Sequence, residues 1–561
     1  MPSTRFSLRH CRIRACHPEP ACRRQGAQPA VKGAQRTICS FLALLASFLV
    51  LFANPAFAQD SPDSLASRIQ KILDRPEFTH ASFGIEFYDL ASGKILYAHD
   101  AGKLFVPAST TKTLTEGALL ATLGPDYRFH TKIYRTGPVD KKGRLKGDLM
   151  LVASGDPDLS NRIQPGGTLA FQDEDHSYGG PAVAGDPLAV IRQLAKDVAA
   201  KGIRRVDGRV LIDASLMPDG PREGGTGVVL SSIMVNDNLI DLIATPGASL
   251  GAPVQLQISP QTSYARFVNH LLTSAAGSKI ALEEPAFTPN PDGTVTIALT
   301  GSLPLGLEPQ TASVAVPSPT LFAETVFREA LSSSGVELKS PLAPIQPDFT
   351  PLAVFYTPEN LVAEHVSVPL SEEIKITLKV SQNLHASMTP YLLGALAAKD
   401  PANALQKGFA IEHDFLQQAN LDFSGASQGD GAGGDWADLF SPDFMCRYLA
   451  YWTTRPDFDI FFRALPILGK DGTLAKIQVD SPAAGHVFAK TGTFDSEDRL
   501  NARLMLNGKG LVGYVHTKSG RKLAFAAYVN HVSLPLDPDA AQNIAGQALG
   551  AIAASAYDAQ F

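Results

Sequence analysis

The chain has 561 residues, of which 45% are hydrophobic and 19% are charged, so it is long enough for roughly two to four domains. Its formal net charge is −6. Because sequence-independent binding to nucleic acid relies on a basic surface, this charge argues against a nucleic-acid partner.

An export signal is predicted over residues 1–58. A basic residue precedes an apolar run over residues 38–53, and Ala56-Phe57-Ala58 supplies a small-residue cleavage site. The run is too short for a comfortable bilayer span, so we expect an exported, periplasmic or cell-envelope protein with at most peripheral membrane association. Residues 5–30 make an unusually long start for such a signal, and an alternative is that translation begins near Val31.

Four of the five cysteines lie in this leader, and only Cys446 lies beyond it. No disulfide can therefore form within the processed chain, and its stability must come from packing. Cys446 lies in an apolar stretch with a helical pattern, so a buried, inert thiol is favoured over a catalytic one.

The first predicted elements are two strands around a turn within residues 83–97. Pro107 follows, and then a helix that is predicted to run to Leu123. Ser109 and Lys112 lie three residues apart at its start, hence on one face and one turn from each other. The first turn of a helix offers free N–H groups and the positive end of the helix dipole, which suit a developing oxyanion.

From residue 131 to residue 360 the pattern changes to short alternating segments separated by Pro and Gly turns, which is typical of strands. One helix is predicted over residues 188–201, and residues 156–186 show so little periodicity that they are predicted as a loop. We interpret residues 131–360 as an inserted, mostly β domain. The pattern leaves open whether it forms one body or two subdomains.

Helical patterns return after residue 361, over residues 370–396, 440–451 and 458–465. Strands are predicted at residues 490–493, 511–517 and 522–530, and a last helix at 540–556. Strands near both ends of the chain with helices between them predict one mixed α/β domain, built from residues 60–130 and 361–561, with the insert hanging from its middle.

Three short motifs follow one another in a fixed order, and nearly half of the chain lies between the first two. They are Ser109-Thr110-Thr111-Lys112, Ser381-Gln382-Asn383 and Lys490-Thr491-Gly492-Thr493. A serine hydroxyl is a poor nucleophile, but Lys112 can serve as its base if burial and a second cation, Lys490, lower the pKa of Lys112. These residue types in this order predict a serine acyl-transferase that works without histidine.

The other motif residues complete this chemistry. Ser381 can pass a proton to a leaving nitrogen, and Asn383 can hydrogen-bond a substrate amide. Gly492 lets a substrate backbone lie alongside a strand, while the hydroxyl groups of Thr491 and Thr493 suit a substrate carboxylate. The N–H groups of Ser109 and Thr493 form the predicted oxyanion hole.

Two other serines compete for the role of nucleophile. Ser519 begins a second S-x-x-K, but in a turn between strands, and Ser427 lies in a G-x-S-x-G that is followed by glycines rather than by the helix this motif needs. No metal and no cofactor are predicted, because the thirteen histidines are scattered and no nucleotide-binding motif occurs. His385, beside the second motif, is predicted to serve packing.

Further segments outside the three motifs match a known family. They are Pro107-Ala108, Leu123-Gly124-Pro125-Asp126-Tyr127-Arg128-Phe129, Gly147-Asp148-Leu149, Gly155-Asp156-Pro157, Asp471-Gly472-Thr473-Leu474 and Gly513-Tyr514-Val515. On these residues the chain, from about residue 80 to residue 535, resembles the D-alanyl-D-alanine carboxypeptidase/endopeptidase class of low-molecular-mass penicillin-binding proteins, in its large-insert branch.

The resemblance implies a serine β-lactamase/DD-peptidase-like domain, an antiparallel sheet with helices, that carries the insert. It implies cleavage of the terminal D-Ala-D-Ala bond, or of D-Ala cross-links, in peptidoglycan stem peptides through an acyl-enzyme on Ser109, which β-lactams would also acylate. It further implies that Asp156 approaches the amine of the third stem residue. The alternative for Asp156 is a turn-forming aspartate before proline.

Residues 430–438 depart from the pattern of this family, which carries serines and an arginine in this segment. Here Trp436 stands at the arginine position, so recognition of the third stem residue can differ. Two alternatives therefore stay open: a peptidoglycan-binding protein with weak turnover, and a β-lactamase or esterase that uses the same residues.

Overall fold

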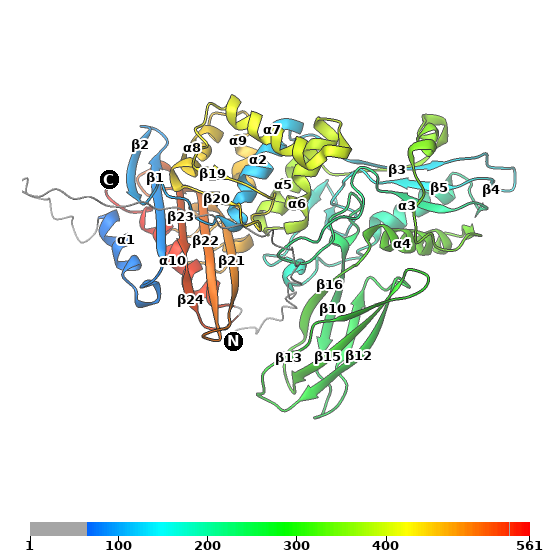
Figure 1. The fold of residues 1–561 in the computed structure, drawn as a ribbon, viewed down its shortest axis with the longest axis horizontal. Helices are drawn as coiled ribbons and strands as arrows, with labels where there is room; N and C mark the ends of the chain where they lie inside the picture. The colour runs from blue at the N-terminus through cyan, green and yellow to red at the C-terminus, as the bar shows by residue number, and fades with distance from the viewer. Residues whose placement is uncertain (1–63, 538) are drawn as a thin grey trace, which may run out of the picture.

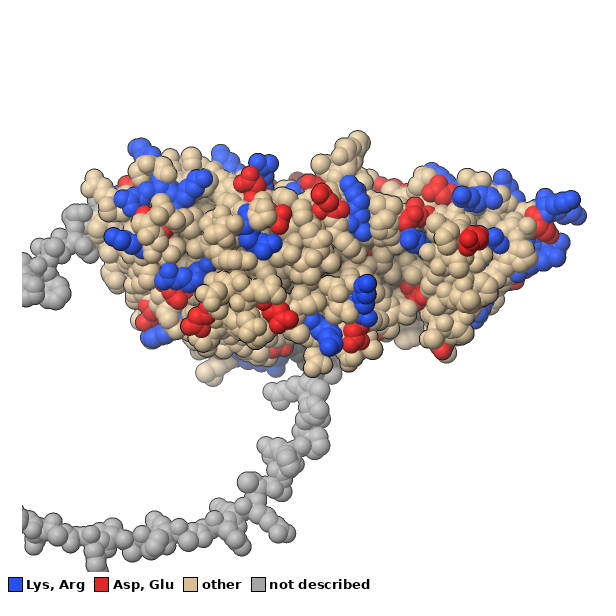
Figure 2. All heavy atoms as spheres, turned by 90° about the horizontal axis from the view of Figure 1, so that it is seen from above, with Lys and Arg blue, Asp and Glu red and all other residues tan. Residues whose placement is uncertain are grey.

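The structure is a computed structural model in which residues 64–537 and 539–561 are described. The predicted export signal lies outside these residues. Among the described helices, none has both the length and the apolarity that crossing a membrane requires. Figure 2 shows Lys and Arg interspersed with Asp and Glu along the visible face, so this side of the molecule carries no broad area of one sign.

An antiparallel sheet of six strands joins the two ends of the described chain (Figure 1). Its order is β2-β1-β23-β22-β21, with β24 paired to β22. The strands are β1 (Ser82–Asp89), β2 (Lys94–His99), β21 (Val487–Asp498), β22 (Arg503–His516), β23 (Lys522–Asn530) and β24 (Val532–Leu534). The predicted strands are thus confirmed, and β1 pairs directly with β23 although nearly the whole chain separates them.

Both faces of this sheet are buried, because alternate residues of a strand point to opposite sides. On β23, Phe525 and Ala527 belong to one core cluster, whereas Ala526 and Tyr528 belong to another. The first cluster includes residues of α1 (Leu65–Leu73) and α10 (Gln547–Ser555), and the second includes residues of α2 (Lys112–Leu123) and α8 (Pro442–Trp452). The sheet and the helices on both of its faces form the sheet domain.

The other elements of the sheet domain surround α2 and α8 or extend the helices already named. They are the α-helices α5 (Leu370–Lys379), α6 (Asn383–Leu392), α7 (Ala404–Gln418) and α9 (Phe458–Ala464), the 3-10 helices η1 (Pro76–Phe78), η2 (Ala108–Thr111), η8 (Pro401–Asn403) and η9 (Gly472–Leu474), the π-helices η7 (Leu393–Ala397) and η10 (Ala541–Gly546), and the strands β19 (Ala426–Ser427) and β20 (Leu439–Phe440). The predicted helices over residues 440–451, 458–465 and 540–556 are confirmed with small shifts. Cys446, on α8, is fully buried, as predicted.

The helical pattern over residues 370–396 is interrupted at the second motif. α5 ends at Lys379, α6 begins at Asn383, and Ser381 between them has a φ of +63°, in the left-handed region. The apolar periodicity runs on because both helices bury residues in the same core cluster, so the pattern alone does not reveal the break. The consequence is that Ser381 lies at a sharp corner rather than on a helix face.

The insert begins with an α/β part, which extends along the long axis of the molecule (Figure 1). It carries a sheet of order β18-β3-β5-β9 and a smaller sheet of order β17-β8-β4. Its elements are β3 (His130–Arg135), β4 (Arg144–Leu145), β5 (Leu149–Val152), α3 (Ala189–Ala200), β8 (Arg205–Val206), β9 (Val210–Asp213), α4 (Pro319–Ser333), β17 (Glu337–Leu338), η5 (Thr350–Phe355), η6 (Pro358–Asn360) and β18 (Leu361–Val366). Because β18 pairs with β3, the insert runs to residue 366 rather than ending at 360.

The second part of the insert is a β lobe, drawn below the first part in Figure 1. Its sheets have the orders β11-β10-β16 and β12-β15-β13, with β14 paired to β15. The strands are β10 (Leu239–Thr245), β11 (Gln255–Ser259), β12 (Ala265–Ser274), β13 (Ala281–Leu282), β14 (Ala286–Pro289), β15 (Val295–Pro304) and β16 (Gln310–Ala315). One core cluster contains residues of both parts, so the two parts pack as a continuous body.

Residues 156–186, predicted as a loop, are largely irregular and lie against the sheet domain. Their short elements are β6 (Ile163–Gln164), β7 (Thr168–Leu169) and η3 (His176–Tyr178). The backbone N–H of Leu169 donates to Glu372 on α5 (2.8 Å), and the Tyr178 hydroxyl donates to the carbonyl oxygen of Ser381 (2.7 Å). The loop therefore reaches the second motif.

Candidate active site

Ser109 lies on η2, the 3-10 turn that leads into α2, as the spacing of the first motif predicts. The residue before it, Ala108, has a φ of +47°, which is unfavourable for a residue with a side chain. Gly433 packs so closely here that a Cβ on it would lie 1.9 Å from the Ala108 carbonyl oxygen. The nucleophile is thus held on a strained turn by the backbone of a distant segment.

Lys112 is fully buried and directs its ammonium group to three acceptors. Its Nζ lies 2.7 Å from Ser109 Oγ, 2.7 Å from Asn383 Oδ1 and 2.9 Å from the Ala432 carbonyl oxygen. The structure therefore brings together the first two motifs and a residue of the 430–438 segment. These three contacts use all three hydrogens of a charged lysine.

Burial lowers the pKa of Lys112 to about 8, because the ammonium group loses its hydration. The negative charges of Glu223 and Asp430 oppose this effect and favour the charged amine. A lysine with a pKa near neutrality can be neutral often enough to accept a proton, which an ordinary surface lysine cannot.

Lys490 reaches the same place from β21 and is also fully buried. Its Nζ donates to Ser381 Oγ (2.8 Å) and to the Thr491 carbonyl oxygen (2.8 Å). Burial, and then the charges of Lys112 and Lys509, hold the pKa of Lys490 well below its usual range. The second and third motifs thus meet through Ser381, and the left-handed corner presents this serine to the lysine.

A pocket opens over these groups. Its lining includes Ser109, Ser381, Thr491, Gly492 and Thr493. The Thr491 hydroxyl donates to that of Thr473 (2.8 Å), whereas the Thr493 side chain is exposed. The predicted nucleophile, proton relay and carboxylate-binding hydroxyls therefore share one pocket, while Lys112, Asn383 and Lys490 lie buried behind it.

Two charged residues of the site carry no sequence signal that could have identified them. Glu223, from the insert, accepts a hydrogen bond from Asn383 Nδ2 (2.9 Å). Lys509, on β22, lines the pocket and donates to Thr493 Oγ1 (2.5 Å). Burial lowers the pKa of Lys509 to about 8. Lys509 is paired with Thr493 in the strand register, a pairing that only the folded sheet reveals.

Asp156 lies elsewhere. It is 1% exposed, and it is not among the described residues that line the pocket. Its Oδ1 accepts the N–H of Asp158 (2.9 Å), which is a turn-forming contact, and its Oδ2 lies 3.5 Å from His365 Nε2. The structure thus places this side chain in the interior of the protein, outside the lining of the pocket.

Among the described residues, two buried groups have the spacing of metal ligands: Asp156, Asp158 and Glu373, and Asp175, His176 and Asp237. In the second group a guanidinium already occupies the position of a cation, because Arg162 Nη2 lies 2.6 Å from Asp175 and 2.8 Å from Asp237. In the first group burial raises the pKa of all three carboxyl groups, which favours their neutral forms.

The 430–438 segment shapes the rim of the site. Asp430 Oδ1 accepts the N–H groups of Ala432 (2.8 Å) and Gly433 (2.5 Å), which fixes the turn that carries the Ala432 carbonyl oxygen to Lys112. The Trp436 side chain is 66% exposed, and its ring centroid lies 5.3 Å from that of Phe494, the residue after the third motif. An aromatic pair thus stands at the rim, on the side where the family pattern has an arginine.

The other predicted candidates lie apart from this chemistry. Ser427 is on the short strand β19 and Ser519 is in a turn, so neither begins a helix. His385 does more than pack, which corrects the prediction: its Nε2 lies 3.0 Å from Asp237 Oδ1.

This arrangement is that of a serine peptidase with the DD-peptidase fold, in which a buried lysine contacts the serine hydroxyl. A family profile for the D-Ala-D-Ala carboxypeptidase 3 (S13) family matches residues 65–554, and the chain belongs to this family. The predicted resemblance, the mixed α/β fold and the serine-peptidase class are thereby confirmed.

Relatives agree with this assignment. The chain is 29% identical over 526 residues to a D-alanyl-D-alanine carboxypeptidase of Actinomadura sp. (strain R39), covering 90% of this chain and 88% of that one. It is 24% identical over 420 residues to penicillin-sensitive carboxypeptidase A of Dictyostelium discoideum, covering 72% of this chain and 75% of that one. The crystal structure of penicillin-binding protein 4 from Haemophilus influenzae, complexed with a β-lactam, has the same fold, with a TM-score of 0.65 and 20% identity over 88% of this chain and 99% of that chain.

We predict that Gly492→Ala disables the site through its backbone. A Cβ at this position would lie 2.3 Å from the Pro107 carbonyl oxygen, so β21 would have to move away from the turn that holds Ser109. Because a displacement of this kind misaligns reacting groups, release of D-Ala from a D-Ala-D-Ala peptide should fall about 100-fold. Gly102→Ala is the matched control, since nothing lies within 4 Å of its added Cβ. Turnover by Gly492→Ala within about twofold of the parent would contradict the prediction.

Proposed function

We propose that the protein is an exported peptidoglycan DD-carboxypeptidase, with DD-endopeptidase activity on D-Ala cross-links, that works through an acyl-enzyme on Ser109 and is acylated there by β-lactams. The observation that carries this proposal is the 2.7 Å contact between Lys112 Nζ and Ser109 Oγ. The apolar run and cleavage site within residues 1–58 support export to the periplasm or cell envelope.

The contacts of Lys112 suggest how it activates the serine. When Lys112 is neutral, it keeps two N–H bonds, which Asn383 Oδ1 and the Ala432 carbonyl oxygen accept. Its lone pair is then directed to the remaining partner, the hydroxyl of Ser109. The amine can take the hydroxyl proton while the serine oxygen attacks the carbonyl carbon of the D-Ala-D-Ala bond.

Ser381 is the group that can return a proton to the leaving amine. Its oxygen accepts a hydrogen bond from Lys490, which leaves its own hydrogen for a partner in the pocket. As the amine of the terminal D-Ala departs, Ser381 donates this hydrogen and takes up in its place the proton that Lys112 removed from Ser109, so that Lys112 is neutral again while Lys490 holds the Ser381 hydroxyl in place. A water molecule then hydrolyses the ester on Ser109, with Lys112 again as the base.

The carboxylate of the terminal D-Ala fits the third motif and its neighbour. Thr491 and Thr493 supply hydroxyl groups to the pocket, and the ammonium group of Lys509 lies 2.5 Å from Thr493 Oγ1. A β-lactam carries a carboxylate in the corresponding place, so the same groups support its binding. The Trp436–Phe494 pair at the rim suits an apolar portion of the stem peptide, in place of a second anionic one.

We expect Ser109→Ala to abolish both covalent labelling by a fluorescent penicillin and D-Ala release, the latter by at least about 10⁴-fold, because the nucleophile is gone. Ser519→Ala removes the serine of the other S-x-x-K and should leave both unchanged. The readouts are gel fluorescence and D-Ala release from monomeric and cross-linked muropeptides. Labelling without D-Ala release from any muropeptide would instead favour a binding protein, and rapid loss of the label would favour a β-lactamase.

The rate of penicillin acylation should rise with pH, because Lys112 must be neutral to accept the proton. Its pKa of about 8 predicts a nearly tenfold rise per pH unit below pH 8 and a plateau above it. Glu223 favours the charged amine, so Glu223→Gln, which can still accept the Asn383 hydrogen bond, should move the midpoint to lower pH. Stopped-flow acylation from pH 5 to pH 10 measures this, and a midpoint that moves upward would refute the assignment of Lys112 as base.

Lys509→Met should weaken recognition of the substrate carboxylate. Loss of one charge-assisted hydrogen bond should raise the KM for a thioester substrate that bears the terminal carboxylate about tenfold, with little effect on kcat. The matched thioester without the carboxylate should be turned over equally by both proteins. Lys509→Arg keeps the charge and serves as the control. An equal KM increase for both substrates would show that Lys509 does not contact the carboxylate.

A further inference from the structure

Three successive residues of the insert, Asn236, Asp237 and Asn238, all have left-handed backbones, with φ of +50°, +53° and +57°. They form the short turn η4 (Asn236–Asn238), and all three side chains are buried. Residues with side chains rarely adopt this conformation, and a run of three is unfavourable unless its surroundings enforce it. The contacts of its three side chains show why the protein keeps so unfavourable a turn.

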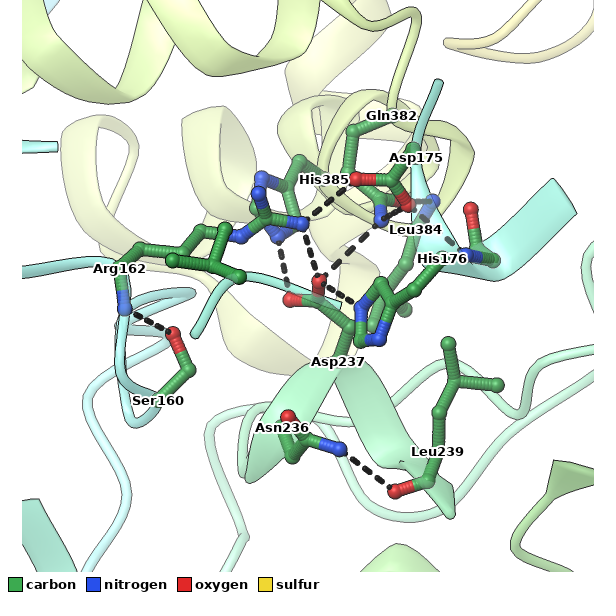
Figure 3. Close-up of polar contacts among 12 residues, drawn as sticks. Ser160, Arg162, Asp175, His176, Asn236, Asp237, Leu239, Gln382, Leu384 and His385 are labelled. Atoms are coloured by element: carbon green, nitrogen blue, oxygen red, sulfur yellow. Dashed lines mark hydrogen bonds and ion pairs between the residues drawn. The ribbon is translucent and has the colours of Figure 1, made fainter. Parts of the chain in front are cut away.

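The two asparagines stabilise the turn from within. Asn236 Nδ2 donates to the Leu239 carbonyl oxygen (3.0 Å), and Asn238 Oδ1 accepts the N–H of Val235 (3.2 Å). Asp237 makes no such local contact: its carboxylate points away from the turn, into the buried space between the insert and α6 (Figure 3). The strained backbone thus serves to project one carboxylate.

This carboxylate joins four side chains from the two domains (Figure 3). From the insert, Arg162 and His176 approach its Oδ2, at 2.8 Å each. From the sheet domain, His385 approaches its Oδ1 (3.0 Å) and Gln382 its Oδ2 (3.4 Å). Gln382 precedes Asn383 in the second motif, and His385 follows Asn383 by two residues on α6. Asp237 therefore binds the start of α6 at two points.

A neighbouring stretch of the insert holds the same segment. Asp175 Oδ1 accepts a second hydrogen bond from Gln382 (3.0 Å), and the Tyr178 hydroxyl donates to the Ser381 carbonyl oxygen (2.7 Å). Asn383 is itself bound to Glu223 of the insert. Each residue of the second motif therefore has a hydrogen-bond partner from the insert.

In this network the guanidinium of Arg162 and the imidazole of His176 face three carboxylates. The buried carboxylates of Asp175 and Asp237 face the guanidinium of Arg162, and His176 lies between Asp237 and Asp241. Burial opposes charge on His176, but the two carboxylates outweigh it and raise the pKa of His176 well above its usual range. Removing one carboxylate from such a network leaves uncompensated charge, so its geometry is strongly determined.

Ser381 needs such support. Its φ of +63° is unfavourable for serine, yet this conformation brings its Oγ to 2.8 Å from Lys490. Lys490 of the sheet domain binds the Ser381 hydroxyl. The insert binds the Ser381 carbonyl oxygen through Tyr178 and the Gln382 side chain through Asp175.

We propose that Asp237 is a positioning residue for acyl transfer: through Gln382 and His385 it holds the Ser381 corner in its left-handed conformation, so that the insert completes the catalytic centre. This inference rests on the proposed role of Ser381 as proton relay. It gives the insert a role in the chemical step itself, beyond any contact with the substrate.

The test compares Asp237→Asn with Asp241→Asn in the otherwise unchanged chain. Asp241 belongs to the same network through His176 and Asn236 (2.7 and 3.0 Å), but no contact joins it to the described residues of α6. Stopped-flow acylation by a penicillin and steady-state hydrolysis of a D-Ala-D-Ala peptide are measured for each. Asp237→Asn should lower the acylation rate constant and kcat at least about tenfold with KM within about twofold, whereas Asp241→Asn should stay within about twofold of the parent in both.

A second variant covers the case in which Asp237→Asn does not fold. Gln382→Met removes the contact from the other side without exposing a buried charge, and it should show the same loss of kcat at constant KM. In the double variant the two effects should not add, because both substitutions break one linkage. Additive effects, equal losses in Asp237→Asn and Asp241→Asn, or an unchanged acylation rate in a folded Asp237→Asn or Gln382→Met would each overturn the proposal. If the parent itself is not acylated at Ser109, the proposed function fails instead.

Discussion

Lys112 carries an amine into the interior of the protein, and its three N–H groups donate to three separate segments: the Ser109 turn, the start of α6 and the 430–438 turn. A buried amine without such partners would be costly. The three segments must therefore stay together, and in doing so they hold Ser109, Lys112 and Asn383 in contact. The same burial that constrains the fold lowers the pKa of Lys112 into the range in which it can act as a base.

The insert belongs to this centre rather than to its periphery. It supplies Glu223 to Asn383, Tyr178 to Ser381 and Asp237 to the residues beside them. On the sheet-domain side, the amine of Lys112 lies close to the carboxylates of Glu223, from the insert, and Asp430. The electrostatic balance of the pocket is thus shared across the two domains, which explains how a catalytic centre tolerates nearly half of the chain between its first two motifs.

The 430–438 segment has two roles, one for its side chains and one for its backbone, and its sequence does not distinguish them. Among the side chains that depart from the family pattern, Trp436 is exposed and faces Phe494, whereas Ala432 is buried. The backbone carbonyl of Ala432 still reaches Lys112, because Asp430 fixes the turn beneath it. Substitution of side chains at the rim can therefore change which stem peptides fit without disturbing the base.

The sequence by itself determined the features that depend on residues near one another in the chain. The order of the three motifs and the three-residue step from Ser109 to Lys112 predicted the chemistry. The apolar periodicities predicted strands near both ends of the chain, helices between them and an insert after the first motif, because such periodicities are a property of neighbouring residues. Only the tertiary structure decided what depends on distant contacts. The break at Ser381 hides within an uninterrupted apolar pattern, Glu223, Lys509 and Asp237 belong to no motif, and Asp156, singled out by resemblance, is buried away from the pocket. Each of these depends on which segments meet in the folded protein, and a backbone corner or a buried ion pair leaves no periodic trace in the chain that forms it.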